Sequence, residues 1–543
     1  SSSCTKMKSF WKASSLFICV FAVYIYYCSK DLNAFLNLYD IVNLLDSKAE
    51  YFNRNENRYL LGNFAPVGEE NFNVPLEIIE GEIPANMSGL FLRVGPNPIP
   101  HHMSRRYHWF DGHGMIHSVR FKDQQALYSN QWIRSPRFNL EQKLDRPVFT
   151  LFGEFKGFLG LFKILFVLPT LSRLIGLPVL ESGQANTAMM MYNKKIYACH
   201  EGSLPFEIRW NQNNSFDSIG YETFGNVLNY PVTAHSKLDP VVGDLYINGY
   251  GLGPGMEQPA KIGAVDASDV VQSYFGLDLP VRPWMHDSMI TENFVLIFES
   301  SAHLSPEGII NGEVFKMNKT HNLRIGVLPK TGSTQDEITW FAADRHYILI
   351  HAMNAYEEVN TDGELEVVLW APLGDDFDGT LVKDSNKYYL SELRMNMGKK
   401  DNKLQITKVG EHNVEFPRVH PHFLGRPSKF GFVPVMGDED AMFYMINKYD
   451  LQEKTLVGQI VLPKGCITNE PIPIPKDEDI SHPKSSDEVW LGLFVYNGET
   501  GAAEYHIYDG ESMSSSPVTR LRVPKRVPYG FHSEWFGEKA MQA

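Results

Sequence analysis

The segments HSKLDPVVGDLYINGY (residues 235–250) and HDSMITENFVLIFES (residues 286–300) decide the fold of this chain. Each opens with a histidine, passes a polar turn and ends in a strand-like run of apolar and aromatic residues. Two further histidines, His351 in ILIHAMNAYEE and His532 in VPYGFHSEW, stand at the edges of similar runs. The intervals between the four are too long for a helical or finger-type metal motif. They can therefore meet only if a large closed fold brings them to one point.

From about residue 60 onward, the chain shows the pattern of short alternating strands and turns that is typical of an antiparallel β-protein. GMIHSVRF and ALYSNQWIR flank the turn KDQQ at residues 122–125, and AMMMY and KIYACHE flank Asn193 and Lys194. Crossover helices are missing between the strands, which argues against a parallel α/β sheet and leaves an antiparallel barrel, sandwich or propeller. The sequence predicts an all-β fold.

The spacing of marker residues favours the propeller. The histidines at 235, 286 and 351 follow one another at intervals of 51 and 65 residues. If Glu415 and Glu470 are admitted as markers, the next intervals are 64 and 55, with 62 more to the histidine at 532. Such a quasi-period is longer than common propeller repeats but suits four-stranded blades with long outer loops, and residues 60–543 accommodate about seven units.

Composition and charge exclude several classes of protein. Hydrophobic residues make up 43% and charged residues 21%, which is ordinary for a globular chain and argues against disorder. The net charge of -14, without a cluster of Lys and Arg, argues against a nucleic-acid partner. The body of the chain holds only Cys199 and Cys466, so we expect no disulfide framework and a reducing compartment.

Three segments lack this pattern of strands and turns. Residues 1–30 are Ser- and Lys-rich and contain a 16-residue apolar run, 13–28, which predicts a targeting or anchor segment: a signal-type region, a marginal anchor or part of a transit peptide. Residues 31–59 carry apolar side chains at three- and four-residue steps, which predicts an amphipathic helix. Residues 151–180 form an apolar insertion with basic flanks, either a buried helical cap or a patch that docks on a membrane, and base rates alone favour the buried cap; the function implied by the resemblance described below shifts our preference to the membrane patch.

The four histidines are suited to a divalent metal. Neutral imidazole binds Fe, Zn, Cu and Ni, and four of them leave the ion its full double charge. Carboxylates would then accept the other ring N–H groups and orient the rings. Glu201 in YACHEGS, Glu415 in VEFPRV and Glu470 in TNEPIP are candidates, because each stands at the end of a strand-like run.

A family resemblance supports this interpretation. FLRVGPNP (residues 91–98) and YHWFDGHGMIHSVRF (residues 107–121) are followed in order by TAHSKLDP, MHDSMITEN, IHAMNAYEE, VEFPRV and VPYGFHSEW. From about residue 60 to the end, the chain resembles the carotenoid cleavage oxygenase family in its plant form. The resemblance implies a seven-bladed β-propeller with a helical cap over an axial Fe(II) ion. The metal ligands would be four histidines and the supporting carboxylates three glutamates: His235, His286, His351 and His532, with Glu201, Glu415 and Glu470.

The resemblance gives other histidines a different role. His108, His113 and His117 cluster in YHWFDGHGMIH, but in the family this string is a fold signature beside the cavity. His200 departs from the family, whose members more often have Ser or Thr there. This change could alter the pocket for dioxygen.

The activity implied by the resemblance is cleavage of one conjugated double bond of a carotenoid or apocarotenoid, with dioxygen, to two carbonyl products. No nicotinamide or flavin fingerprint opens a βαβ unit. Alternatives are a stilbene-cleaving oxygenase, a non-cleaving relative of the isomerase type and a metal-free propeller scaffold. We expect a membrane-associated plastid protein with peripheral contact through residues 151–180. The alternatives are a cytosolic protein or one anchored to another membrane through residues 13–28.

Overall fold

The computed structural model describes residues 30–48, 57–102, 106–251, 256–304, 306–311, 313–377, 386–437, 442–477 and 484–542. The predicted targeting or anchor segment, including the apolar run 13–28, lies outside the described residues except for Lys30.

The described residues form seven antiparallel blades, so the predicted seven-bladed β-propeller is confirmed. Blade 1 comprises β32 (Ser533–Gly537), β3 (Gly89–Asn97), β4 (His113–Lys122), β5 (Gln125–Trp132) and β1 (Asn71–Pro75). Blade 2 comprises β6 (Ala188–Tyr192), β7 (Lys195–Cys199), β8 (Phe206–Trp210) and β9 (Phe216–Tyr221). Blade 3 comprises β10 (Lys237–Leu238), β11 (Leu245–Tyr250), β12 (Ala260–Val265) and β13 (Val271–Leu277).

Blades 4 and 5 continue the same meander. Blade 4 comprises β14 (Ser288–Ile290), β15 (Phe294–Glu299), β18 (Arg324–Pro329) and β19 (Thr339–Ala342). A separate two-stranded sheet is formed by β16 (Ala302–Leu304) and β17 (Phe315–Met317). Blade 5 comprises β20 (Asn354–Val359), β21 (Leu365–Gly374), β22 (Tyr388–Asn396) and β23 (Leu404–Lys408).

Blades 6 and 7 are fused into one nine-stranded sheet. Blade 6 comprises β24 (Phe430–Met436), β25 (Phe443–Asp450) and β26 (Thr455–Val461). Blade 7 comprises β28 (Ile472–Pro475), β29 (Val489–Asn497), β30 (Ala503–Asp509), β31 (Thr519–Val523) and β2 (Glu77–Gly81). Between them β27 (Cys466–Thr468) pairs with both β25 and β29, which joins the two blades.

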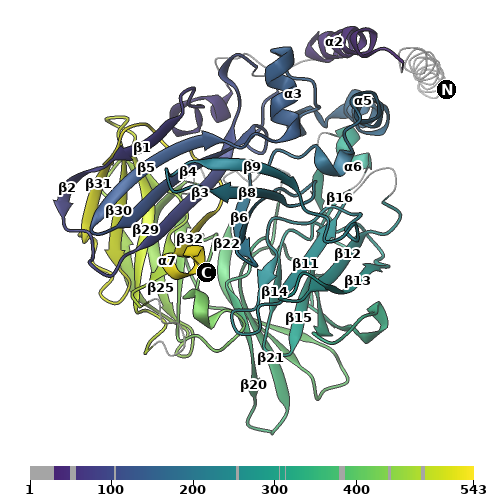
Figure 1. The fold of residues 1–543 in the computed structure, drawn as a ribbon. Coiled ribbons are helices and arrows are strands. Elements are labelled where there is room, and N and C mark those ends of the chain that lie inside the picture. Colours follow the sequence, from purple (N-terminus) through teal and green to yellow (C-terminus); the bar gives the residue numbers. More distant parts are fainter. Residues whose placement is uncertain are drawn as a thin grey trace, which may run out of the picture.

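Strands from the two halves of the chain close the ring. The C-terminal strand β32 pairs antiparallel with β3, with Arg93 opposite Ser533. The N-terminal strand β2 pairs with β31, with Glu77 opposite Arg522. Figure 1 shows the yellow C-terminal strands beside the purple N-terminal ones. Closure leaves few free sheet edges and holds the blade ends in fixed positions around the axis.

Helices cover one side of the propeller (Figure 1). The α-helices and the π-helical turn are α2 (Leu32–Lys48), α3 (Pro136–Leu144), α4 (Gly157–Phe162), η6 (Lys163–Val167), α5 (Leu168–Ile175), α6 (Pro306–Asn311) and α7 (Glu538–Gln542). The 3-10 turns are η2 (Arg58–Leu60), η3 (Gly62–Phe64), η4 (Pro100–His102), η5 (Phe152–Glu154), η7 (Val179–Glu181), η8 (Gln335–Glu337) and η9 (Pro421–Phe423). The helix α2 (Leu32–Lys48) lies within the predicted segment 31–59, of which residues 49–56 lie outside the described residues.

The apolar insertion 151–180 has a buried side and an exposed side. Its helical run Gly157–Ile175 is long and apolar enough to cross a membrane, by length and composition alone. One side packs against α2, where Phe162, Val167 and Leu171 join a buried cluster with Phe35 and Tyr39. Other side chains of the run, those of Phe158, Leu165 and Phe166, are between 36% and 44% exposed.

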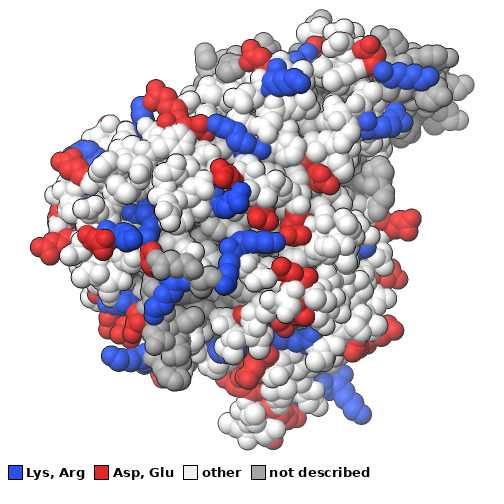
Figure 2. Space-filling view, viewed as in Figure 1, with Lys and Arg blue, Asp and Glu red and all other residues white. Residues whose placement is uncertain are grey.

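Charged side chains of both signs are spread over the face that Figure 2 shows. Figure 2 shows Lys and Arg interspersed with Asp and Glu on the visible face, without a large area of one sign. Among the described residues the cysteines Cys199 and Cys466 are free and buried. Both therefore act as small apolar side chains in the core.

Candidate metal centre

The four predicted histidines occupy equivalent places in four different blades. His235, His286, His351 and His532 each stand one to three residues before the first strand of a blade, namely β10, β14, β20 and β32. In a propeller these innermost strands surround the axis. Equal positions in successive blades therefore bring residues that are far apart in the sequence to one point.

The histidine ligand atoms lie within 4.8 Å of one another. The Nε2 atom of His286 is 3.1 Å from that of His235 and 3.0 Å from that of His351. The His532 ring centroid lies 4.5 Å from that of His235 and 4.9 Å from that of His351. All four rings therefore face one small volume, as the sequence predicted.

Three of the four rings contact a glutamate through the opposite nitrogen. His286 Nδ1 lies 3.2 Å from Glu201 Oε2, and His351 Nδ1 lies 2.6 Å from Glu415 Oε2. The remaining pair is His532 Nδ1 and Glu470 Oε1, 3.2 Å apart. Glu201 follows β7, and the other two glutamates precede inner segments of blades 6 and 7. Among the described residues no carboxylate contacts the His235 ring.

These carboxylates have different electrostatic settings. Burial opposes ionisation of Glu470, but Arg418, which donates through Nε at 2.8 Å, and His532 together lower its pKa to about 2. Burial likewise opposes ionisation of Glu201, yet His286 and the hydroxyl of Tyr250 at 2.7 Å lower its pKa. By contrast, burial raises the pKa of Glu415 well above its usual value.

The donor set fits a bound cation. Because Glu201 and Glu470 are favoured as carboxylates, they stabilise the tautomers of His286 and His532 that carry the proton on Nδ1 and present the lone pair of Nε2 to the centre. Lone pairs about 3 Å apart repel one another, and a metal ion between them removes that repulsion. Its charge would also favour the ionised form of Glu415.

Three of the rings, those of His235, His351 and His532, are held in the neutral state that metal binding needs. Burial lowers the pKa of His235 and His351 well below the usual value, and the neighbouring histidines lower it further. Burial also lowers the pKa of His532, although Glu470 opposes this. Neutral imidazoles bind a metal without first releasing a proton.

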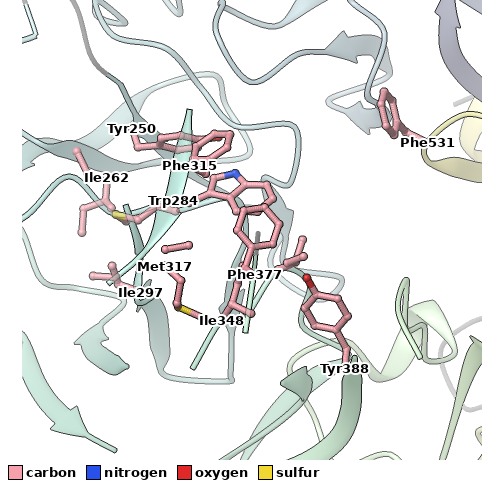
Figure 3. Close-up of a cluster of buried hydrophobic side chains, with 14 of the residues drawn as sticks. Tyr250, Ile262, Trp284, Ile297, Phe315, Met317, Ile348, Phe377, Tyr388 and Phe531 are labelled. Atoms are coloured by element: carbon pink, nitrogen blue, oxygen red, sulfur yellow. The ribbon is translucent and has the colours of Figure 1, made fainter. Parts of the chain in front are cut away.

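A largely apolar cavity of about 340 Å³ opens onto three of the histidines, His286, His351 and His532. Trp284 stacks on Phe315 at 4.4 Å between ring centroids and lies 5.4 Å from His286. Figure 3 shows Tyr250, Trp284 and Phe315 gathered in one cluster, with Phe531 approaching from another part of the chain. Further aromatic residues complete the wall: Trp109, Phe110, Phe152, Phe416, Phe443 and Tyr529.

The cap contributes to the same cavity. Ile164 and Leu168, from the insertion 151–180, lie in its wall, as do Ile309 of α6 and Val314. The cavity is therefore enclosed between the axial end of the propeller and the helices that cover it. A ligand inside would contact the metal-binding rings on one side and the cap on the other.

The residues match a known family. Residues 64–537 match the family model described as RPE65, retinal pigment epithelial membrane protein. The carotenoid 9,10(9',10')-cleavage dioxygenase 1 of Phaseolus vulgaris is 30% identical, over 93% of this chain and 94% of that protein. The carotenoid 9,10(9',10')-cleavage dioxygenase of Crocus sativus is 28% identical, over 92% of this chain and 93% of that protein.

The chain belongs to this family, the carotenoid cleavage oxygenases. Solved structures of similar fold include lignostilbene dioxygenase of Pseudomonas brassicacearum, with a TM-score of 0.76, 20% identity and coverage of 89% of this chain and 99% of that one. Cobalt-substituted Synechocystis ACO gives a TM-score of 0.72 and 19% identity, with coverage of 87% and 97%. At these identities the likeness concerns the fold, and the shared fold agrees with the propeller described above.

The other histidines noted in the sequence lie outside the four-histidine group, and two of them pair with other side chains. His113 Nε2 lies 2.9 Å from Glu141, and His117 Nδ1 lies 2.7 Å from the hydroxyl of Tyr128. His108 lies in the loop before β4. His200 lines the cavity, and its Nδ1 accepts a hydrogen bond from the amide of Gly202 at 3.1 Å.

Sequence reasoning missed several residues that shape the centre. Arg418 donates to Glu470 through two nitrogens, and Tyr250 donates to Glu201. Phe416 adopts a positive φ of 55°, a strained conformation for a bulky residue, and its ring lies 4.5 Å from that of His532. Arg418 and Phe416 belong to the string VEFPRV, so their proximity to Glu415 was visible, but their contacts were not.

Proposed function

We propose that this protein is a non-haem Fe(II) dioxygenase that cleaves one conjugated double bond of a carotenoid or apocarotenoid. The observation that carries the proposal is the convergence of four imidazoles, three of which line an apolar, aromatic-rich cavity. The family relatives named carotenoid cleavage dioxygenases support the same activity. One carbon–carbon double bond and one dioxygen molecule give two carbonyl groups, so the reaction balances without another co-substrate.

Residues of this chain would hold the metal and orient it. His235, His286, His351 and His532 would be its ligands, and Glu201, Glu415 and Glu470 would hold three of the rings in the required tautomer. When bound, Fe(II) supplies the reactivity towards dioxygen. Four protein ligands leave positions for dioxygen, and an apolar substrate has no need to coordinate the ion.

The cavity would select the bond that is cut. A polyene chain offers almost no hydrogen-bonding groups along its length, so its position depends on the shape of the wall. Trp284, Phe315 and Phe416 would contact its flat faces, and closure by the cap would keep bulk water away from the centre. The volume of about 340 Å³ lies near the lower end of the range for ligand sites, which favours a short substrate.

Membrane contact and location are part of the proposal. The exposed side chains of Phe158, Leu165 and Phe166 lie on the same helical run that contributes Ile164 and Leu168 to the cavity. Contact of this run with a bilayer would let an apolar substrate reach the cavity without crossing water. Relatives named chloroplastic in Arabidopsis thaliana and Oryza sativa favour a plastid location.

Incubation of the purified iron-loaded protein with a panel of carotenoids, apocarotenals and stilbenes under air, with product masses recorded, tests the activity. We expect two carbonyl products from an apocarotenoid, each with an oxygen atom from labelled dioxygen. Products without the label would indicate an isomerase-type reaction. Turnover of stilbenes alone would identify a stilbene-cleaving oxygenase, and absence of bound iron together with absence of turnover would identify a binding scaffold.

A further inference from the structure

The cavity wall contains one cationic side chain, among the described residues, that the metal centre does not use. Arg137 is the second residue of α3, a cap helix that starts at Pro136 and is capped by Ser135, whose hydroxyl accepts from the amide of Phe138 at 3.2 Å. Its side chain lines the cavity, and the residue is only 7% exposed. A buried guanidinium in a largely apolar wall requires a physical reason.

The neighbours of Arg137 leave its donors unused. Glu141 Oε2 lies 3.9 Å from Nε, beyond hydrogen-bond distance, and the guanidinium stands 4.8 Å over the ring of Phe149. The Nε atom is buried without a hydrogen-bond partner among the described residues. Arginine has five N–H donors in a fixed fork, so at least this one points to no acceptor of the protein.

Glu141 cannot easily supply the missing acceptors, because other groups already use it. Its Oε1 accepts from the amides of Val148 at 2.9 Å and Phe149 at 3.0 Å. Its Oε2 lies 2.9 Å from His113 Nε2. The carboxylate therefore balances the charge of Arg137 at short range while leaving guanidinium N–H groups free to bind something else.

Polar side chains also line the cavity. They include Ser182, Gln184 and His200, together with Asp111, Thr150 and Thr187. The Ser182 hydroxyl donates to the carbonyl of Val179 at 2.7 Å, so it has no hydrogen left to donate to a ligand. His200 precedes Glu201, which contacts the ring of His286, so His200 adjoins the metal centre. Three of the four histidines and Arg137, whose Nε has no acceptor among the described residues, therefore line the same cavity.

We infer that Arg137 is a specificity-determining residue that donates hydrogen bonds to an oxygen at the end of the substrate. The preferred substrate is then a polyene with a terminal carbonyl or hydroxyl group and not a hydrocarbon carotene. Because Glu141 balances the cationic charge, a neutral oxygen is a sufficient acceptor. A hydrocarbon end would leave the donor buried without a partner, which disfavours its binding. This inference rests on the proposed function and deepens it.

The test compares three polyenes of one chain length: an aldehyde, the corresponding primary alcohol and the corresponding methyl-terminated hydrocarbon. For the iron-loaded wild-type protein we expect kcat/KM for the aldehyde to exceed that for the hydrocarbon by about 10- to 100-fold, the discrimination expected of a hydrogen bond to a buried charged group. Arg137→Met should remove most of this ratio. Arg137→Lys keeps the charge but not the fork and should retain part of it. Lys143→Met, an exposed change on the same helix, should leave the ratio as in wild type.

Binding is measured separately from turnover, by quenching of the fluorescence of cavity tryptophans such as Trp109 and Trp284 in the absence of dioxygen. A preference for the aldehyde in binding that disappears in Arg137→Met, without cleavage of any polyene, would support Arg137 and overturn the proposed function. Cleavage of aldehyde and hydrocarbon with equal efficiency by wild type would overturn the inference and leave the proposed function standing. If Arg137→Met fails to fold, Arg137→Lys and the wild-type substrate series decide the same question.

Discussion

The two walls of the cavity are built in different ways. The metal-facing wall takes each of its four histidines from a different blade, and the residues span positions 235 to 532. The cap-facing wall comes largely from local stretches of chain, such as α3 and the insertion 151–180. The metal-facing wall depends on closure of the whole ring, whereas the cap-facing wall depends on helices that pack on its rim.

The metal-facing wall therefore determines the reaction, and the cap-facing wall determines which substrate binds. The ends of paired inner strands are rigid, so they hold ligands within the small tolerances that a metal requires. Cap helices contact the propeller through fewer backbone hydrogen bonds, and their sequence can change without moving the histidines. We therefore expect changes in the metal-facing wall to abolish the reaction and changes in the cap-facing wall to alter substrate, membrane contact or local stability.

The largest effect should follow from His286→Ala. Its Nε2 atom lies within 3.1 Å of two other ligand atoms, so its loss opens the centre of the quartet. Metal content and turnover should fall together to background, measured by metal analysis and product formation. His346→Ala, a half-buried histidine outside the cavity wall, is the control. Retained turnover in the His286 variant would contradict the ligand assignment.

The supporting carboxylates should have smaller and distinct effects. Glu415→Gln removes the carboxylate that lies 2.6 Å from His351 and should weaken metal affinity or rate by about 10- to 100-fold. Glu470→Gln should show the same loss and also lower the melting temperature of the metal-free protein, because Arg418 would lose its buried anionic partner. Titration with Fe(II) and thermal melts separate the two effects. Equal melting temperatures for both variants would argue against this role of Arg418.

Within the cap, Glu141→Gln should reduce stability moderately. The substitution removes the charge between Arg137 and His113 and should lower the free energy of unfolding by about 1–3 kcal/mol at neutral pH. Burial opposes ionisation of Glu141, but Arg137 and His113 lower its pKa to about 2. A lowered folded-state pKa means that this stability is present above the usual value of 4.5 and is lost as pH falls through about 2.

Denaturant unfolding of wild type and Glu141→Gln over that pH range measures the effect. The difference between them should shrink as the pH falls from about 4.5 towards about 2. Glu453→Gln, an exposed change in blade 6, should leave the stability of the protein unchanged at all pH values. A constant difference across the range would show that lost packing, and not charge, causes the destabilisation.

The smallest effect on chemistry should follow from changes on the exposed side of the cap. Replacement of Phe158, Leu165 and Phe166 by Ser removes apolar area that would enter a bilayer and should reduce co-sedimentation with liposomes about tenfold or more. Turnover of detergent-dispersed substrate should persist, because these side chains do not line the cavity. Serine at Val241 and Val242, which are 61% and 55% exposed on blade 3, is the matched control. Unchanged sedimentation of the triple variant would restrict the insertion to the role of a cap.

Local pattern determined much of the architecture from the sequence alone. The alternation in GMIHSVRF and ALYSNQWIR, with polar residues between them, predicts the hairpin of β4 and β5, because side-chain direction in a strand and turn chemistry depend on immediate neighbours. The histidines and glutamates were also found, since their contexts recur at blade intervals and match the family strings. The fusion of blades 6 and 7 through β27 was not predicted, because pairing of one short strand with two neighbours leaves no local signal.

The strands, their hairpins and the residue types capable of binding a metal follow from the order of the amino acids alone. The tertiary structure alone decided which carboxylate faces which ring, that Arg418 pairs with Glu470, and that Arg137 is buried without an acceptor for its Nε. The physical reason is that these contacts join residues far apart in the chain or depend on which neighbours satisfy a buried group. Closure of the propeller ring and packing of the cap determine these long-range contacts and buried neighbours, whereas local propensity does not.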